Sequence, residues 1–349
     1  MSWIITGEQV NPTGDAQITY GITSTGGVFN LRSAGPVDYE VEWGDGTVER
    51  STSNVLAHTY AAGSYVLKIR TSQQYTPLFN NSTDEDQITS VALVSDLDVG
   101  TTLTSAWSGA NNITDFNAAF GVTAGVTNFG SAWNNCTGLT SFPLIDTSSG
   151  DNFSFTWRDC TSLTSFPLLD TSSGTDFGYA WRNCTGLTSF PLIDTSSGTS
   201  FISTWRDCRG LTSFPEINTS IGTNFDTSWF SCTGLTSFPL LDTSSGTHFG
   251  ATWRSCSNLT SFPANFFDSW TATPANGCFV STWQGCTSLT ATSVENILNS
   301  IDTSLQSAPA SGVDITIDYN AASGPLNIST AVSNLKSRNW TITLNGVLQ

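Results

Sequence analysis

The side chains best suited to covalent or metal chemistry are the eight cysteines. Seven of them recur at a regular interval, with 24 residues between successive members of the first six: Cys136, Cys160, Cys184, Cys208, Cys232, Cys256 and Cys286. Zinc would need ligands paired as Cys-x-x-Cys or Cys-x-x-His, and the chain has no such spacing. Disulfides between neighbours are a second option, but an odd set of thiols pointing inward with Trp and Phe favours buried free thiols that act as small hydrophobes.

Catalytic chemistry has few candidate groups. The chain has two histidines, His58 and His248, and no Ser, His and Asp arrangement is visible. Paired acids do not recur in a context that would form a cleft. We therefore predict a protein that is not an enzyme, with no catalytic residues, no cofactor and no metal ligands.

Arginines form a second regular series, spaced by 24 residues or a multiple of it: Arg158, Arg182, Arg206 and Arg254. The residues that follow them are Asp159, Asn183, Asp207 and Ser255. If these positions stack, an Arg that pairs with Asp of a neighbouring repeat would form an exposed ladder worth little per pair. The alternative interpretation is a strip that binds anions.

An aspartate series has the same period, with Asn218 in place of one acid: Asp146, Asp170, Asp194 and Asp242. Each is followed by Thr-Ser-Ser-Gly or a close variant, which favours Asx turns or helix caps. A ladder of calcium sites is the alternative. Asn218 favours the turn interpretation, because an amide still caps but coordinates calcium less well.

Thr-Ser pairs recur once per repeat and supply candidate partner-binding residues: Thr164, Ser165, Thr188, Ser189, Thr212 and Ser213. On stacked strands they would make a flat lattice of hydroxyls. Solvation and β propensity explain them adequately, and a face that meets glycan or a partner protein is the alternative.

A six-residue insertion interrupts the regular spacing after Trp253 and brings Phe266, Phe267 and Trp270. Packing against the end of the repeat array is the favoured interpretation of the insertion itself. Specific recognition, however, needs irregular aromatic features that fill pockets, so we expect any specific contact to use these three residues or the C-terminal region.

The element that must position all these series is the 24-residue unit. Tryptophan follows the same period as cysteine: Trp133, Trp157, Trp181, Trp205, Trp229, Trp253 and, after the insertion, Trp283. Such strict repetition predicts a solenoid. Within a unit, Phe153, Trp157, Cys160 and Leu163 have the spacing of one helical face, and residues 163–169 resemble a short strand, so we predict coils of strand, turn and short helical segment with the Trp and Cys columns buried.

The pattern Cys-x-x-Leu-x-x-Phe, then a Ser/Thr turn, then Phe-x-x-x-Trp-x-x-Cys resembles the BspA-type leucine-rich repeat of bacterial surface and phage-encoded proteins. The resemblance covers about residues 84 to 290, with Trp where those repeats usually carry Phe. It implies a leucine-rich-repeat solenoid over 88–290, a scaffold for surface contact rather than a particular activity.

The N-terminal part alternates apolar and polar residues with Gly-Asp-Gly at 44–46, which predicts β-structure. The segments around Trp43-Gly44-Asp45-Gly46 and His58-Thr59-Tyr60 resemble the polycystic-kidney-disease (PKD) domain. The resemblance implies an Ig-like β-sandwich over 16–72 in which these residues are structural. We further expect an N-terminal arm over 1–15 and a polar linker over 73–87.

The last part, 291–349, changes character and predicts an α/β cap. Thr292-Ser293-Val294-Glu295 has the pattern of a capping box before a helix, Ile315 and Ile317 indicate a strand, 329–337 a second helix and 340–344 a closing strand. Similar tails end many phage proteins of the BspA type. The predicted fold is thus a repeat solenoid between a β-sandwich and an α/β cap.

Composition narrows the function. Eleven Lys and Arg stand against 28 Asp and Glu, a net charge of −17, which opposes binding to nucleic acid or anionic lipid. The N-terminus lacks the features of a signal peptide and no run is long and apolar enough to cross a membrane, so release of a phage particle by lysis is the expected route outside a cell.

We therefore expect a structural or adhesive component of a phage virion, such as a tail fibre, head fibre or capsid-surface protein, located on the virion surface. A secreted bacterial surface adhesin is the alternative. Expected partners are other virion proteins at the N-terminal region, a host surface protein or glycan, and a second copy of the chain; nucleic acid and membrane insertion are not expected.

Overall fold

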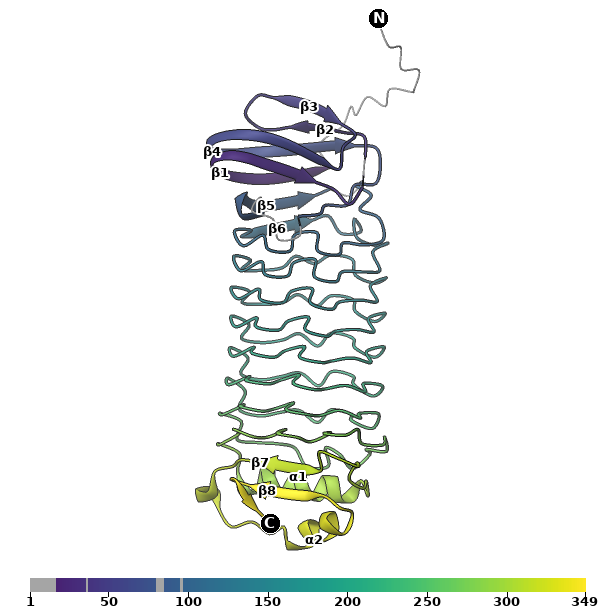
Figure 1. Ribbon diagram of the computed structural model, residues 1–349, viewed down its shortest axis with the longest axis vertical. Helices are drawn as coiled ribbons and strands as arrows, with labels where there is room; N and C mark the ends of the chain where they lie inside the picture. Colours follow the sequence, from purple (N-terminus) through teal and green to yellow (C-terminus); the bar gives the residue numbers. More distant parts are fainter. Residues whose placement is uncertain (1–16, 36, 80–84, 95–96) are drawn as a thin grey trace, which may run out of the picture.

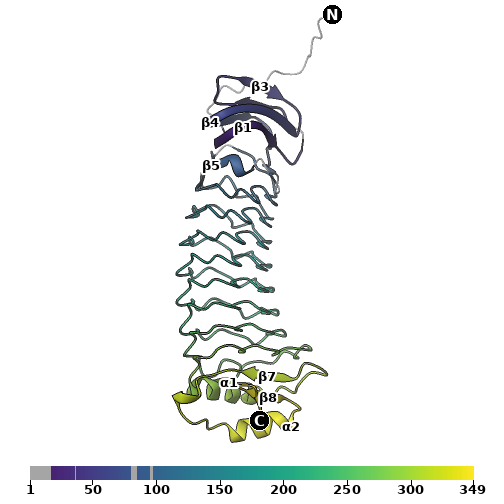
Figure 2. The same cartoon turned by 60° about the vertical axis from the view of Figure 1, so that its left-hand side comes forward.

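The computed structural model describes residues 17–35, 37–79, 85–94 and 97–349. These form an elongated stack of coils, with a β-sheet at its N-terminal end and a small α/β unit at its C-terminal end (Figure 1). The stack is straight and the coils lie parallel to one another when the molecule is turned (Figure 2). The predicted arm, 1–15, lies outside the described residues.

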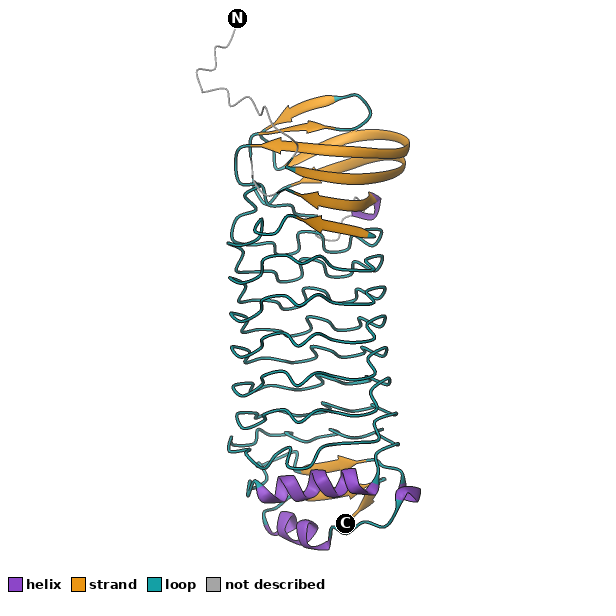
Figure 3. Cartoon of the chain, turned by 180° about the vertical axis from the view of Figure 1, so that it is seen from behind, coloured by secondary structure: helices purple, strands orange, loops and turns teal. Residues whose placement is uncertain are grey.

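The coils contain tandem turns where short helical segments were predicted. From residue 119 to 290 the described chain has no helix, and its β-structure is limited to isolated bridges (Figure 3). Amides of Phe153, Phe155, Trp157 and Asp159 donate to carbonyls of the next coil, and the amides between them close turns within the coil. The predicted helix is wrong because a helix would use every amide internally, whereas this arrangement gives every second amide to the neighbouring coil.

Left-handed backbone marks each of these turn runs. Phe155 and Asp159 have φ of 59° and 62°, and the equivalent positions of the other regular coils repeat the pattern with Tyr, Asn, Ser, Thr or Ala. The four predicted inward residues are nevertheless buried, including Phe153 and Leu163. A run of four-residue turns returns side chains to one face at nearly the helical interval, so the side-chain pattern is the same for both structures.

The Thr-Ser side was predicted to be a parallel strand, and this is also wrong for most coils. The Thr164 amide donates to the Thr140 carbonyl at 3.2 Å, and a bridge joins Ser237 to Ser261. Pro167, three residues after Thr164, has no amide hydrogen to extend the pairing. The continuous row of parallel bridges lies instead just before the turn run, from Thr102 through Asn152 to His248.

Aromatic columns fill the interior of the stack. The seven predicted tryptophans and Trp107 are buried, and neighbouring indole rings stack with centroids 5.2–5.9 Å apart. Phe rings meet the indoles edge to face, as Phe214 does with Trp205 at 4.8 Å. The seven predicted cysteines are buried beside them as free thiols. Each thiol donates to the carbonyl of the tryptophan one coil earlier, as Cys160 does to Trp133 at 3.2 Å.

At the N-terminal end, one six-stranded sheet has the order β3-β2-β4-β1-β5-β6. Its strands are β1 (Ile18–Arg32), β2 (Tyr39–Glu42), β3 (Val48–Ser51), β4 (Val55–Thr71), β5 (Ile88–Leu93) and β6 (Asp115–Ala118). The 3-10 turn η1 (Glu85–Gln87) precedes β5. β5 pairs with β1 antiparallel and with β6 parallel, so the sheet continues into the first coils without a break.

This sheet is folded over on itself. Tyr20 and Phe29 both belong to β1 and would lie about 30 Å apart in a straight strand. Both rings contact Phe79, with centroids 5.7 and 6.1 Å away, so the strand curls around that ring. Gly26 and Gly27, both with positive φ, lie in the curved part. Two packed sheets were expected; one curled sheet encloses this core instead.

The predicted polar linker, 73–87, contributes to this core. Tyr75 is fully buried and meets Tyr39 edge to face at 5.5 Å, and Phe79 is 1% exposed. Residues 80–84 lie outside the described part. A separating linker is therefore wrong for the described portion, because the segment packs under the sheet that it was expected to connect.

The C-terminal unit consists of two helices and a small sheet. Its elements are α1 (Ala291–Thr303), β7 (Asp314–Ile317), η2 (Ala321–Ser323), α2 (Ser329–Ser337), β8 (Thr341–Leu344) and β9 (Val347–Leu348). α1 begins two residues earlier than predicted: Thr290 is its N-cap and accepts from the Ser293 amide, and Glu295 accepts from the Asn327 amide. The unit lies across the last coil, where Trp283 forms a bridge with Ile317.

Candidate binding surface

The eight cysteine thiols are buried and do not reach the surface of the protein. Burial raises the pKa of Cys160 and of Cys256 to about 12, and raises the pKa of Cys208 further. A thiol that stays protonated is a poor nucleophile and a poor metal ligand. No group of three or more His, Cys, Asp or Glu that could hold a metal ion occurs in the described part of the chain.

The aspartate series makes Asx turns. Asp146 accepts from the backbone amide of Ser148 at 3.1 Å and from its hydroxyl at 2.7 Å, and Asn218 does the same for Ser220. Hydrogen bonds from Ser196 lower the pKa of Asp194. One carboxylate oxygen per coil is thereby used within its own loop, as the turn interpretation predicts.

The predicted contact residues of the insertion are buried. Phe266, Phe267 and Trp270 are at most 2% exposed. Phe267 meets Phe279 edge to face at 5.3 Å, and the Trp270 indole nitrogen donates to the Gly246 carbonyl at 2.6 Å. The prediction that these rings bind a partner is therefore wrong, and the packing interpretation of the insertion is confirmed. The enlarged last coil and α1 need apolar side chains between them.

The Thr-Ser pairs are on the surface. All six predicted residues are exposed: Thr164, Ser165, Thr188, Ser189, Thr212 and Ser213. Threonine hydroxyls donate along the stack to the preceding threonine carbonyl, as Thr164 does to Thr140 at 3.2 Å. The hydroxyl lattice therefore exists as a surface. Whether it meets a partner stays a prediction.

Sequence reasoning missed a row of leucines beside this lattice. The exposed members, each at least 46% accessible, are Leu144, Leu168, Leu192 and Leu240. Glu216 occupies the equivalent place in the fourth of the five coils. Two apolar residues follow the proline of most coils, and this pair could have revealed the row. The second residue, such as Leu169, is buried, and the first is exposed. The row adds apolar area to a face otherwise covered by hydroxyls.

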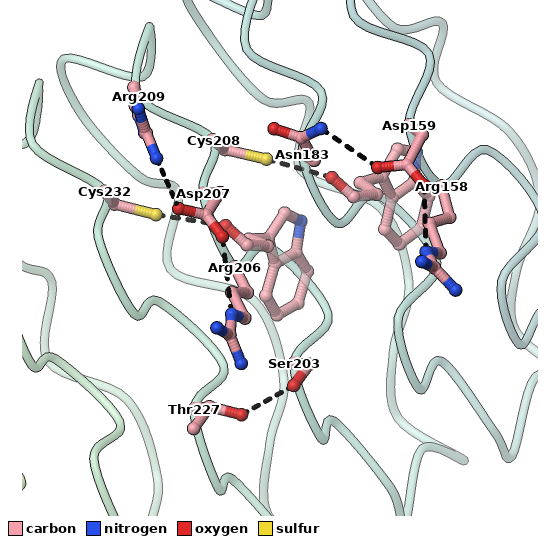
Figure 4. A network of polar contacts seen from close by, with 12 residues as sticks. Arg158, Asp159, Asn183, Ser203, Arg206, Asp207, Cys208, Arg209, Thr227 and Cys232 are labelled. Atoms are coloured by element: carbon pink, nitrogen blue, oxygen red, sulfur yellow. Dashed lines mark hydrogen bonds and ion pairs between the residues drawn. The ribbon is translucent and has the colours of Figure 1, made fainter. Parts of the chain in front are cut away.

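A second surface runs along the turn side of the coils, and we call it the arginine strip. Its members are Phe155, Arg158, Tyr179, Arg182, Arg206, Arg209, Phe230 and Arg254. Arg158 lies 3.0 Å from Asp159 and Arg206 3.3 Å from Asp207 (Figure 4). The predicted pairing with a neighbouring coil is wrong for these two arginines, because each reaches the aspartate that follows it in sequence.

Aromatic rings hold the guanidinium groups of the strip in place. Arg158 lies over Phe155, Arg182 over Tyr179, and both Arg206 and Arg254 over Phe230, at 4.5–5.8 Å from the ring centroids. Phe155 and Tyr179 stack on each other at 4.5 Å. Sequence inspection noted the arginines but not these rings, although Phe155 and Tyr179 are 24 residues apart and Phe230 occupies an arginine position.

The His58 and Asp45 pair is part of the N-terminal sheet. His58 Nε2 lies 2.7 Å from Asp45 Oδ2, and its ring stacks on Trp43 at 4.4 Å. Hydrogen bonds from Thr47 and His58 lower the pKa of Asp45 to about 2. Tyr60 donates to the Trp43 carbonyl, so the four residues hold one turn against one strand, as their structural interpretation predicts.

Comparisons with known proteins give one structural neighbour. No protein-family model matches the chain, and no curated protein matches its sequence. Among solved structures, the chain is similar to a leucine-rich repeat protein from Bacteroides ovatus, at 14% identity over 72% of this chain and 92% of that one, with a TM-score of 0.24.

Proposed function

We propose that this protein is a structural or adhesive component of a phage virion surface, a tail fibre, head fibre or capsid-surface protein without enzymatic activity. The observation that carries the proposal is the pair of long periodic surfaces, the Thr-Ser face and the arginine strip, displayed on a straight stack. Repeat solenoids provide extended surfaces of this kind for contact with other molecules. In this proposal the coils are leucine-rich repeats of the BspA type.

The junction at the N-terminal end supports a role as a rigid mount. β5 shares hydrogen bonds with β1 on one side and β6 on the other, so force applied to the sheet passes into the coils through paired strands. A flexible linker would decouple the two parts. We propose that the N-terminal region, a PKD-like domain in this proposal, attaches to other virion proteins and that the coils point outward.

The distribution of perturbed groups supports a role other than catalysis. Burial raises the pKa of Tyr20 and Tyr75 in the N-terminal core and of the thiols in the coils. Catalytic groups with shifted pKa values usually face a cleft, whereas these side chains pack against aromatic rings. We propose no cofactor and no nucleic-acid partner, in keeping with the net charge of −17.

No helix in the described part of the chain is long and apolar enough to span a membrane. The proposed partners outside the particle are a host surface protein or glycan, and self-association along the Thr-Ser face remains part of the proposal because its leucines are exposed. A secreted bacterial surface adhesin is the competing proposal, since the same surfaces serve either setting.

Immunogold electron microscopy with antibodies against the purified protein tests this assignment. Lysates and washed cells of the producing strain should be labelled in parallel, with pre-immune serum as the control. We expect gold on phage particles and no gold on the surfaces of the cells. Gold on intact cells without particles would favour the adhesin, and labelling of neither would contradict a surface role.

A further inference from the structure

The positive charge of the solenoid is concentrated in one place. Between residues 88 and 290 lysine and arginine together number five, and all five are arginines of the strip. They occupy the coils from Arg158 to Arg254, in a protein whose net charge is −17. All five lie on the turn side of the coils, so the strip is a local concentration of positive charge on an acidic protein.

Two of these arginines keep their charge unneutralised. Among the described residues, neither Arg182 nor Arg254 has a carboxylate within ion-pair distance, because Asn183 and Ser255 replace the aspartates that follow Arg158 and Arg206. Asn183 instead donates to Asp159 at 2.9 Å and draws that carboxylate into the network of Figure 4. Within the described part of the chain neither guanidinium group is neutralised by an acid, so both can meet an anion.

The strip is also organised in advance. Arg182 is held over the Tyr179 ring at 5.8 Å, and Phe230 lies between Arg206 at 4.5 Å and Arg254 at 5.8 Å. Side chains already restrained by cation–π contact lose less freedom when they bind. A planar guanidinium fixed in this way suits bidentate recognition of a carboxylate.

The backbone along the strip argues against a peptide as the ligand. Amides of Phe155 and Trp157 donate to the next coil, and Arg158 closes a turn within its own coil. An extended peptide usually binds by pairing its main chain with an open strand edge, and the strip offers none along these coils. Recognition must come from side chains alone, through charge and the faces of rings.

We infer that the arginine strip binds a linear acidic polysaccharide, with its ring carboxylates on Arg182 and Arg254 and a sugar ring against the half-buried Tyr179. The two arginines are three coils apart, about 14 Å at the usual spacing of paired strands. A polymer with repeated carboxylates reaches both at once, which a monosaccharide cannot. The inference rests on the proposed surface-contact role and gives that role a ligand class.

Titration calorimetry of the full chain with polygalacturonate and alginate tests the inference. The R182Q/R254Q variant removes two charges without breaking an ion pair. R50Q/K68Q removes two charges from exposed pairs with Asp38 and Glu42 in the N-terminal sheet and controls for the change in net charge. We expect the parent and the control to bind with similar affinity. The dissociation constant of R182Q/R254Q should be higher by about tenfold or more. Binding should weaken as salt is raised.

Further arms separate the ligand classes. Methyl-esterified polygalacturonate keeps the sugar and loses the charge, and should not bind. Y179S, which places in this coil the residue found at Ser203 in the next, should weaken binding without changing net charge. Failure of the parent to bind either acidic polymer, equal binding by R182Q/R254Q, or equal binding of poly-L-glutamate would each overturn the inference.

The failure of this inference is distinguishable from failure of the proposed function. If immunogold labels particles or cells but R182Q/R254Q binds the acidic polymers as the parent does, the surface role stands and the strip is not its site. If the polymers bind through the strip but neither particles nor cells are labelled, the site stands and the surface role fails.

Discussion

The two long sides of a coil differ in how they use their backbone. On the turn side, Phe153 to Asp159 send every second amide to the next coil and hold the stack together. On the Thr-Ser side, the contact between coils falls to single bonds such as Thr164 to Thr140, with the remaining polar groups facing water. The backbone hydrogen bonds that join the coils are thus concentrated on the turn side, and substitutions on the two sides should differ in their effect on stability.

The largest expected effect is removal of an indole from the turn side. Trp205 is fully buried and stacks on Trp181 at 5.9 Å and on Trp229 at 5.2 Å. Trp205→Ala should lower the free energy of unfolding by about 3–5 kcal/mol, because it leaves a cavity between two stacked rings. Urea denaturation followed by circular dichroism measures the change.

Leu192→Ala is the matched control on the Thr-Ser side. Leu192 is 61% exposed, so its truncation should change stability by about 0.5 kcal/mol or less. Comparable losses at Trp205 and Leu192 would contradict the division between the two sides.

A smaller effect concerns the thiols and pH. The folded pKa of Cys160, about 12, lies above the ordinary value of about 8.5, so the folded state keeps a proton that the unfolded chain loses. That contribution is complete below the unfolded pKa and is lost as pH rises toward the folded value. Stability should therefore fall between pH 8 and pH 10.

Cys160→Ala isolates the thiol term. Between pH 8 and pH 10 this variant should lose about 1–2 kcal/mol less stability than the parent, whatever its loss at neutral pH. Thiol reagent added to the native parent at pH 8 should find almost no reactive group among the eight buried cysteines. Rapid modification of several thiols would show that the column is open to solvent.

The smallest expected effect compares two threonine hydroxyls. Thr204 is buried on the turn side and donates to the Phe177 carbonyl at 2.9 Å, whereas Thr212 is exposed and donates to Thr188 at 3.5 Å. Thr204→Ala should cost about 1 kcal/mol, although Ala180 occupies the same place one coil earlier. Thr212→Ala should be nearly neutral, measured by the same denaturation; a larger loss at Thr212 would reverse the assignment of the two sides.

The sequence predicted side-chain columns better than backbone structure. Trp157, Cys160 and Leu163 are buried as expected, because a strict 24-residue period requires equivalent residues to stack. The same spacing suits a helix and a series of turns. Of the two left-handed positions, the one that Phe155 occupies carries little conformational signal, whereas Asp159 belongs to a type that tolerates positive φ. The hydrogen bonds between coils could not be predicted either, because they depend on this turn backbone.

Candidate surfaces divided in a similar way. Exposure of the Thr-Ser pairs followed from polarity alone. The rings of Phe266, Phe267 and Trp270 proved to be core, which confirms the packing interpretation of the insertion and contradicts the expectation that they bind a partner. The strip needed the structure, because the contacts of Phe230 with Arg206 and Arg254 depend on how coils superimpose. Sequence spacing located the arginines without showing what restrains them.

The column of stacked indoles has an optical consequence. Eight chromophores with nearly parallel planes, each 5.2–5.9 Å from the next, are close enough for their electronic transitions to couple. We therefore expect excitation to pass between neighbouring rings, and the near-ultraviolet circular dichroism of the tryptophans to change when the coils lose their register. The tryptophan signal would then report how many coils remain stacked in register.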